Sequence, residues 1–160
     1  MVMTERGYED PSVRQLAVFL QNRVGQLREA LKTLDGAGVC VQALAITDSA
    51  DFAVLRLVVD RTEAAARALT EAGFVSTEVQ ALAVEIPEDP NGLLSVCRAL
   101  IQGEININYC FPMLSRPRGR ACVVIHVDSR STAADILRRN GFGLLDEADL
   151  LQQKGGGSGA

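Results

Sequence analysis

The chain has little aromatic character and no excess of positive charge. Its 160 residues include no tryptophan, only 4% aromatic side chains and a formal net charge of −4. So few aromatic side chains largely exclude stacking platforms for nucleotide bases or sugar rings. Binding to a phosphate backbone needs a basic excess, which this chain lacks. We therefore expect no nucleic-acid partner.

Motifs of enzymes and of metal or cofactor sites are also missing. The chain contains no HExxH, CxxC, GxGxxG or P-loop pattern. Its single histidine, His126, has apolar neighbours in an expected strand, where a partly buried structural role is the better interpretation. No Ser–His–Asp set can be assembled around it. Glu85, Glu88 and Asp89 follow an expected strand, where acidic residues are usually solvated. We expect no catalytic residue, no metal ligand and no cofactor.

The chain has no long hydrophobic run and no secretion signal. A transmembrane helix needs about 18 consecutive apolar residues, and neither such a stretch nor a signal-peptide pattern is present. We therefore expect no membrane partner and a cytoplasmic location. The four cysteines, Cys40, Cys97, Cys110 and Cys122, lie on apolar faces of expected elements, which favours buried free thiols.

The most informative feature that the chain does have is an internal repeat. Residues 16–74 and 82–142 carry the same marks in the same order, at offsets of 66 to 68 residues. Insertions in surface loops produce offsets that drift by single residues, so we interpret the segments as two copies of one unit. The matching marks are Leu16-Ala17-Val18 with Leu82-Ala83-Val84, Gly25 with Gly92, Leu27 with Leu94, Gly36 with Gly103, Asp60 with Asp128, and Gly73-Phe74 with Gly141-Phe142.

Hydrophobic periodicity predicts the order strand, helix, strand, strand, helix, strand in each copy. Asp60 and Asp128 stand where the N-cap of the second helix belongs. The expected strands cover residues 13–20, 39–45, 52–59 and 75–80 in the first copy and 82–86, 105–111, 121–127 and 144–145 in the second. The first expected helix begins at residue 26 and ends at Gly36 or Gly38, and the others cover residues 62–72, 93–102 and 132–140.

This order is the split βαβ arrangement of ferredoxin-like folds. We predict an α+β chain with two ferredoxin-like βαββαβ units, antiparallel sheets and helices packed on one face. The other sheet face is apolar and would be bare, so we expect a homodimer or a higher homo-oligomer. The predicted organisation is a flexible lead-in over 1–12, units over 13–80 and 81–150, and a tail over 151–160 with a linker or expression scar.

A basic cluster, Arg116, Arg118 and Arg120, lies between two expected strands of the second copy. Proline and glycine alternate with the arginines, as is typical of a hairpin tip. The simpler interpretation is a solvated tip. The alternative is a contact surface for an acidic partner.

The turn before the first helix of each copy is the main candidate for a binding site. Both turns place a glycine at a helix start, Gly25 in the first copy and Gly92 in the second. Glycine lets a ligand approach the backbone closely, and the N–H groups of the first helical turn favour an anion such as a carboxylate. The alternative is that glycine serves only the turn geometry while Asn or Asp caps the helix.

At these residues the chain resembles the ACT domain, a sensor of small molecules, usually amino acids, that is attached to or associated with metabolic enzymes. The shared pattern is Asn-x-x-Gly-x-Leu after a strand, then a helix, then an asparagine that opens the second strand. The resemblance covers both copies, roughly residues 13–148, and the whole chain is similar to free-standing tandem ACT proteins without a catalytic domain. It implies allosteric regulation.

In the ACT family the glycine turn contacts backbone groups of the amino acid, and the strand-two asparagine contacts it across a domain interface. The first copy keeps Asn22 and Gly25 but has Cys40 at the strand-two position. The second copy keeps Gly92 and Asn106 but has Asp89 in the turn. The resemblance therefore implies a composite site across the seam or loss of binding in one copy. The ligand-binding residues so predicted are Asn22, Arg23, Val24, Gly25, Gln26, Leu27, Asp89, Asn91, Gly92, Leu93, Leu94, Cys40 and Asn106.

The favoured hypothesis is a non-catalytic regulatory module. It would bind an amino acid or similar small carboxylate at ACT interfaces and signal to a partner metabolic enzyme or change its own assembly. Three charge-assisted hydrogen bonds, less the cost of immobilising the ligand, leave about −4 to −8 kcal/mol, a Kd of about 1 mM to 1 μM. The alternative is a structural subunit of an enzyme with decayed ligand sites, motivated by Cys40 and Asp89. An acylphosphatase-like enzyme of the same topology is disfavoured, because only Arg23 and Gly25 match its phosphate cradle.

Overall fold

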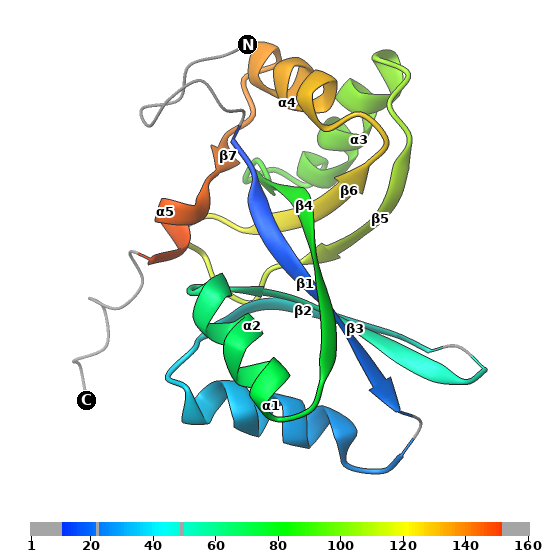
Figure 1. The fold of residues 1–160 in the computed structure, drawn as a ribbon. Coiled ribbons are helices and arrows are strands. Elements are labelled where there is room, and N and C mark those ends of the chain that lie inside the picture. The colour runs from blue at the N-terminus through cyan, green and yellow to red at the C-terminus, as the bar shows by residue number, and fades with distance from the viewer. Residues whose placement is uncertain (1–10, 22, 49, 152–160) are drawn as a thin grey trace. The chain divides into compact units, whose positions relative to one another are not determined.

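The computed structural model describes residues 11–21, 23–48 and 50–151. These residues form two compact units, and each has its own sheet, helices and core (Figure 1). The N-terminal unit comprises residues 14–79, and the C-terminal unit comprises the rest of the described chain. No helix within the described ranges is long and apolar enough to cross a membrane.

The N-terminal unit is a four-stranded sheet with two helices. Its elements are β1 (Val13–Gln21), α1 (Gln26–Gly36), β2 (Val41–Asp48), β3 (Phe52–Val59), α2 (Thr62–Glu71) and the first part of β4 (Val75–Glu85). The strand order is β2-β3-β1-β4, and β3 pairs antiparallel with both β1 and β2. Because β4 is one continuous strand, the two strands predicted over 75–80 and 82–86 form a single element.

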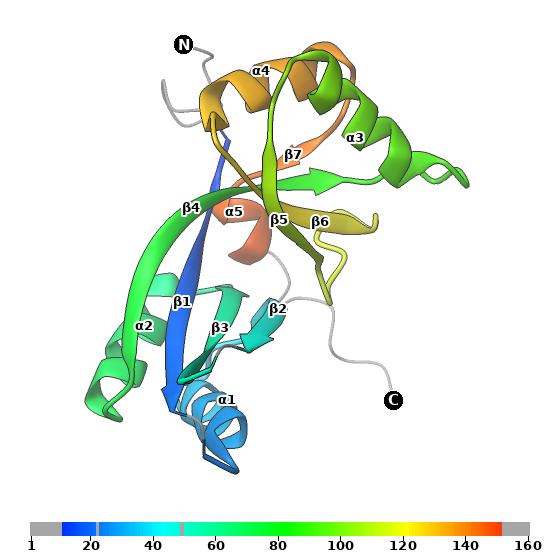
Figure 2. The same ribbon diagram turned by 90° about the vertical axis from the view of Figure 1, so that its right-hand side faces the viewer.

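The core of the N-terminal unit lies between one sheet face and the two helices. Leu16, Val18 and Leu20 alternate along β1 and pack against Ala30 of α1 and Leu69 of α2. The intervening residues of β1 point to the opposite face, as the pleat of a strand requires. Figure 2 shows α1 and α2 on the same side of this sheet.

The C-terminal unit repeats the arrangement. Its remaining elements are α3 (Gly92–Gln102), β5 (Ile107–Pro112), β6 (Cys122–Val127), α4 (Arg130–Arg139), β7 (Leu144–Leu145) and α5 (Glu147–Leu151). The strand order is β7-β4-β6-β5, again with antiparallel pairing. Its core joins Leu82 and Val84 of β4 to Leu100 of α3 and Leu137 of α4. The predicted α+β class with two ferredoxin-like units is confirmed.

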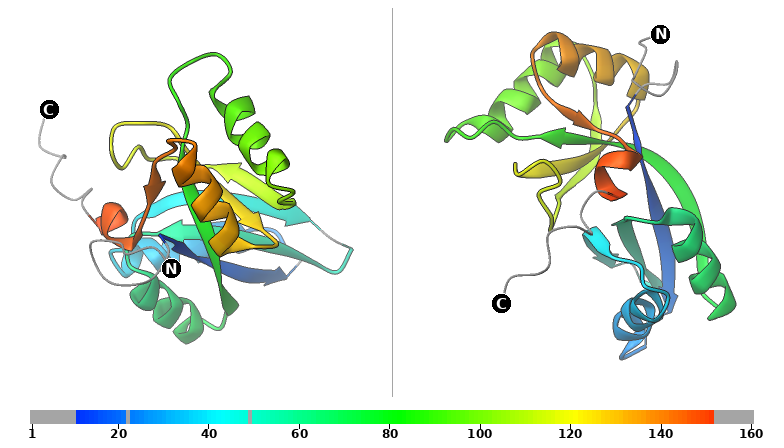
Figure 3. Two further views of the ribbon diagram at one scale, coloured as in Figure 1. Left: turned by 90° about the horizontal axis from the view of Figure 1, so that it is seen from above. Right: turned by 90° about the vertical axis from the view of Figure 1, so that its left-hand side faces the viewer.

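One helix was not predicted. α5 follows β7 directly and lies on the side of the sheet away from α3 and α4 (Figure 3). Its start is fixed by Asp146, whose Oδ1 accepts the backbone N–H groups of Ala148 and Asp149 at 2.9 and 3.1 Å. A helix this short leaves almost no periodic pattern in the sequence.

The expected N-cap role of Asp60 and Asp128 is wrong. The N-cap positions of α2 and α4 are Arg61 and Ser129, and neither makes a capping bond through its side chain. Asp60 Oδ1 instead accepts the backbone N–H of Cys40 at 2.8 Å, and the Asp60 N–H donates to the Cys40 carbonyl at 3.1 Å. Asp128 and Asn106 form the same pair of bonds, both 3.3 Å long. Each aspartate therefore fixes the residue just before the edge strand of its unit.

The first helix of each unit ends in the same left-handed turn, but with different residues. Gly38 has φ of +69° after α1, and Glu104 has φ of +57° after α3. In both turns the next residue donates its N–H to the helix, Val39 to Leu34 at 3.0 Å and Ile105 to Leu100 at 2.9 Å. Glu104 carries a Cβ in a backbone conformation that favours glycine.

Replacing Glu104 with glycine should raise the free energy of unfolding by about 1 kcal/mol. The left-handed backbone costs a residue with a Cβ roughly 1–2 kcal/mol, which the greater freedom of glycine in the unfolded chain partly offsets. Glu104→Ala is the control, because it removes the carboxylate and keeps the Cβ. Urea unfolding measures all three proteins, and equal stability of the glycine and alanine variants would contradict this account.

The two aspartate contacts should differ in strength. Asp60 is 5% exposed and makes the shorter bond, whereas Asp128 is exposed. Asp60→Ala should therefore lower the free energy of unfolding by about 2 kcal/mol and Asp128→Ala by about 1 kcal/mol or less. Thermal unfolding of the two variants in parallel checks this order, and equal losses would show it to be wrong.

Candidate functional site

The turn before α1 is open around its glycine. Gly25 is the N-cap residue of α1 and has φ of +88°, a left-handed conformation that favours glycine. A Cβ built at Gly25 would have no neighbouring atom within 4 Å. Arg23 and Val24 are exposed, and Gln26 and Leu27 are half-buried. The glycine therefore meets a requirement of the turn and also leaves space beside the backbone. Asn22 lies outside the described residues.

A hollow of about 340 Å³ lies beside this turn. It is lined by residues 19–21 at the end of β1, by Arg23 and Gln26 of the turn, by residues 51–52 at the start of β3, and by residues 72–75 between α2 and β4. All of these segments belong to the N-terminal unit. The structure thus brings two of the predicted site residues, Arg23 and Gln26, into one hollow.

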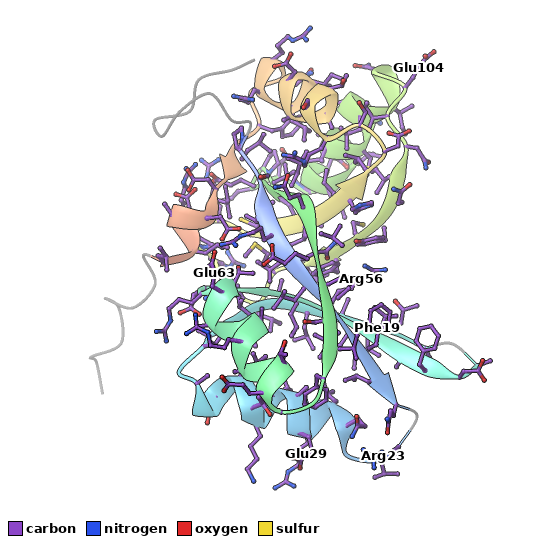
Figure 4. All side chains as sticks on the ribbon, viewed as in Figure 1. Phe19, Arg23, Glu29, Arg56, Glu63 and Glu104 are labelled. Carbon is purple, nitrogen blue, oxygen red and sulfur yellow. The ribbon has the colours of Figure 1, made fainter. Side chains whose placement is uncertain are left out.

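The hollow combines two opposite charges with aromatic side chains. Arg23 supplies a guanidinium and Asp51 a carboxylate, while Phe19, Phe52 and Phe74 also line the space. The rings of Phe19 and Phe52 meet edge to face, with centroids 5.9 Å apart and planes at 62°. Figure 4 shows Phe19 on the sheet face away from α1 and α2, and Arg23 at the turn beyond the end of β1.

Sequence analysis missed Asp51 and the phenylalanines of this hollow. Phe74 was recognised only as a mark of the repeat. The register of β1 with β3 pairs Gln21 with Phe52, and this pairing places Asp51 beside the turn. Because α1 and β2 separate β1 from β3 in the chain, no local pattern in the sequence indicates this register.

The corresponding turn of the C-terminal unit is built differently. Asn91 is the N-cap residue of α3, and its N–H donates to Asp89 Oδ1 at 2.8 Å. A Cβ at Gly92 would lie 2.2 Å from the carbonyl oxygen of Pro87. Glycine is therefore required here for close packing against the chain's own backbone. Leu93 and Leu94, the other predicted residues of this turn, are 49% and 47% exposed.

Cys40 and Asn106 occupy equivalent places, as the repeat predicts. Each precedes the edge strand of its unit and bonds to the aspartate described above. Asn106 also donates through Nδ2 to Asn108 Oδ1 at 3.0 Å, and Asn108 Nδ2 lies 2.9 Å from His126 Nδ1. His126 is half-buried and stacks on Tyr109 with centroids 4.8 Å apart, in agreement with the predicted structural role. Gly25 and Asn106 belong to different units, and a composite site between them stays a prediction.

The strand register identifies the counterpart of the hollow in the C-terminal unit. Phe19 pairs with Val54 across β1 and β3, and Glu85 pairs with Cys122 across β4 and β6. The two pairs are related by the offsets of the repeat, 66 and 68 residues. Glu85 therefore occupies the place of Phe19.

That place holds an ion cluster formed by Glu85, Arg118 and Asp149. Arg118 donates to Asp149 through Nε at 3.2 Å and Nη2 at 3.0 Å, and to Glu85 through Nη1 at 3.1 Å. The side chains of Glu85 and Asp149 are 10% and 11% exposed. Gly143 makes room for the cluster, because a Cβ there would lie 2.6 Å from Glu85 Oε1.

The ion cluster bears on two predictions. Arg118 is exposed, as the interpretation of a solvated tip predicts, but it also connects the hairpin to β4 and α5, and Glu85 is not a solvated turn residue. Burial lowers the pKa of the Arg118 guanidinium, but the charges and hydrogen bonds of Asp149 and Glu85 outweigh burial and raise it above its ordinary value. Burial, together with the charge of Glu85, raises the pKa of the neighbouring Cys122 thiol to about 11.

The cysteine prediction is correct only in part. All four thiols are free, and Cys122 is buried. Cys40 and Cys110 are exposed and Cys97 is half-buried, which contradicts the expected burial. Cys40 immediately precedes the edge strand β2 and Cys110 lies on the edge strand β5, where one side has no neighbouring strand to cover it.

The family described as the ACT domain pair matches residues 11–153. The chain belongs to this family. Comparison with curated proteins found no match. Among solved structures, protein BT0572 from Bacteroides thetaiotaomicron is similar over 88% of this chain and 96% of its own, with 27% identity and a TM-score of 0.80.

Two other structural neighbours are regulatory subunits of aspartate kinase. The subunit from Thermus thermophilus, in its ligand-free form, is 14% identical and has a TM-score of 0.56; the subunit from Thermus flavus is 12% identical with a TM-score of 0.51. In each case the similarity covers 82% of this chain and 93% of the other. At these identities the similarity shows a shared fold. The family predicted from the glycine turns is confirmed by the domain-pair match.

Replacing Arg118 with glutamine should lower the free energy of unfolding by about 2–3 kcal/mol, because it takes the cation from the largely buried Asp149 and leaves Glu85 with Arg120 alone, at 4.0 Å. Arg118→Lys should restore only part of the loss, since an ammonium cannot supply the guanidinium fork. Arg116→Gln, an exposed change in the same hairpin, should stay within about 0.5 kcal/mol of wild type. Urea unfolding distinguishes them, and equal effects at the two positions would exclude this role of the cluster.

Proposed function

We propose that this ACT domain pair is a non-catalytic regulatory module that binds a free amino acid in the hollow of the N-terminal unit. One observation carries the proposal: the hollow is lined by a guanidinium, a carboxylate and an amide, from Arg23, Asp51 and Gln26, beside the open turn at Gly25. A free amino acid carries an α-carboxylate and an α-ammonium group, which are complementary to this set.

The chemistry of each group suggests its role. The α-carboxylate would accept hydrogen bonds from Arg23 and from the N–H groups of the first turn of α1, where the helix dipole favours negative charge. The α-ammonium group would donate to Asp51. Absence of a side chain at Gly25 would allow the ligand to approach the backbone. The remaining predicted residues, including Asn106 in a composite site, stay predictions.

A regulatory role without catalysis is supported by the state of the single histidine. His126 lies within hydrogen-bond distance of Asn108 and stacks on Tyr109 with an interplanar angle of 3°. We propose that the ligand is bound and sensed, and we assign no step of bond cleavage to it.

The proposal includes a downstream partner. Two structures of similar fold are regulatory subunits of aspartate kinase, and we propose an enzyme of amino-acid metabolism in the cytoplasm as the partner.

Self-association is part of the proposal too, because Phe19, Phe52 and Val75 are 38%, 41% and 65% exposed around the hollow. Binding of the amino acid would change the assembly or its contact with the enzyme.

A second candidate function is a structural subunit whose ligand sites have decayed. The C-terminal unit favours it, because Pro87 covers Gly92 and the Arg118 cluster occupies the counterpart of the hollow. Co-purification from native cells separates the two functions. A stoichiometric enzyme partner whose binding ignores amino acids would favour the structural role.

Calorimetric titration with each of the twenty amino acids tests the proposed function. At least one should bind with a Kd between about 1 μM and 1 mM, and Arg23→Gln or Asp51→Asn should weaken it by about tenfold or more, the loss of one charge-assisted hydrogen bond. Arg28→Gln is the matched control, since Arg28 is exposed on α1 and does not line the hollow. No binding of any amino acid would overturn the proposal.

A further inference from the structure

The residues that line the hollow bear on which amino-acid side chains it would accept. The charged residues that line it are Arg23 and Asp51. In the proposed function these two charges are taken by the carboxylate and ammonium groups that all amino acids share. The walls left for the ligand's side chain come from Phe19, Phe52 and Phe74, from neighbouring aliphatic residues, and from the amides of Gln21 and Gln26.

Apolar walls favour an apolar ligand side chain for two reasons. Phe19 and Phe52 are more than a third exposed, and a ligand that covers them would remove apolar surface from water. A charged side chain would lose hydration against the phenyl rings, and once Arg23 and Asp51 are taken, the amides of Gln21 and Gln26 are the polar side chains left among the lining residues. A volume of about 340 Å³ is at the lower end of the range for small-molecule pockets, about 300–1,000 Å³.

The C-terminal unit has replaced three of the apolar lining positions and keeps a phenylalanine, Phe142, in place of Phe74. At the offsets of the repeat, Glu85 stands in place of Phe19, Arg120 in place of Phe52 and Gly143 in place of Val75. Arg118 and Asp149 complete an ion cluster with Glu85 there. The guanidinium of Arg118 thus already satisfies the largely buried carboxylates, and an incoming ligand would have to displace it.

We propose that the hollow of the N-terminal unit takes an amino acid with a large apolar or aromatic side chain, and that each chain binds one such ligand. The proposal rests on the proposed function and narrows it in two ways. It names the ligand class, and it sets the stoichiometry, because the ion cluster closes the counterpart in the C-terminal unit.

Isothermal titration of the full chain with L-phenylalanine, L-leucine, L-alanine, L-aspartate and L-lysine tests this. One of the first two should bind at least about tenfold more tightly than the other three, as expected for burial of a large apolar side chain. The stoichiometry should be one ligand per chain. Equal or tighter binding of the small or charged amino acids, or two ligands per chain, would overturn the inference.

Variants in the wall separate selectivity from general binding. Phe52→Thr should reduce the preference for the large apolar ligand over L-alanine by about fivefold or more, whereas Arg23→Gln should weaken all ligands alike. Ile46→Thr is the matched control, because Ile46 is 45% exposed on β2 and does not line the hollow. Phe19→Thr repeats the test if the Phe52 variant does not fold. An unchanged preference in the folded variant would show that these walls do not select the ligand.

The two proposals fail in different ways. If no amino acid binds, the proposed function itself is wrong. If amino acids bind without preference for apolar side chains, or bind twice per chain, the proposed function stands and only the present inference is wrong.

Discussion

A largely buried carboxylate, that of Glu85, determines how the C-terminal unit is completed at the end of its central strand. A carboxylate with so little exposure needs a cation, and Arg118 reaches it from the hairpin between β5 and β6. The guanidinium has further N–H donors, and two of its nitrogens donate hydrogen bonds to Asp149, which belongs to α5. Gly143 has no side chain where the carboxylate lies. The Arg118 side chain thus joins the hairpin, the end of β4 and α5, and the space that the Glu85 carboxylate takes requires a glycine at position 143.

The N-terminal unit has an equivalent core but carries an apolar side chain at the position of Glu85. Phe19 stands where Glu85 stands, so there is no charge to neutralise, and the aromatic pair with Phe52 borders a hollow. Both cores consist of alternating apolar residues on the strands facing two amphipathic helices. The duplication has therefore preserved what holds each unit together and diverged where the sheet end meets its loops, which is where binding sites on rigid scaffolds are usually found.

Much of the fold follows from local pattern, and the errors come from contacts distant in sequence. Strand β3 and helix α1 match their predicted ranges because apolar periodicity and glycine stops are local signals. The local pattern predicts Asp60 as an N-cap, yet the N-cap position is Arg61 and Asp60 bonds to Cys40, which lies 20 residues away. Glu85 and Arg118 are 33 residues apart, so their pairing could not be read from either segment alone. The candidate site was predictable as far as the Gly25 turn, whereas Asp51 reaches the hollow only through the register of β1 with β3.

The path of β4 bears on how a bound ligand could act on the rest of the chain. Val75, the first residue of β4, lines the hollow, and Glu85, its last residue, carries the carboxylate of the ion cluster. An amino acid held between Arg23 and Asp51 would contact the beginning of this strand. Regulation requires that the ligand bind two states of the protein with different affinity. The hollow and the ion cluster occupy equivalent positions in the two units. They also include the first and last residues of β4, the one strand that contributes to both units.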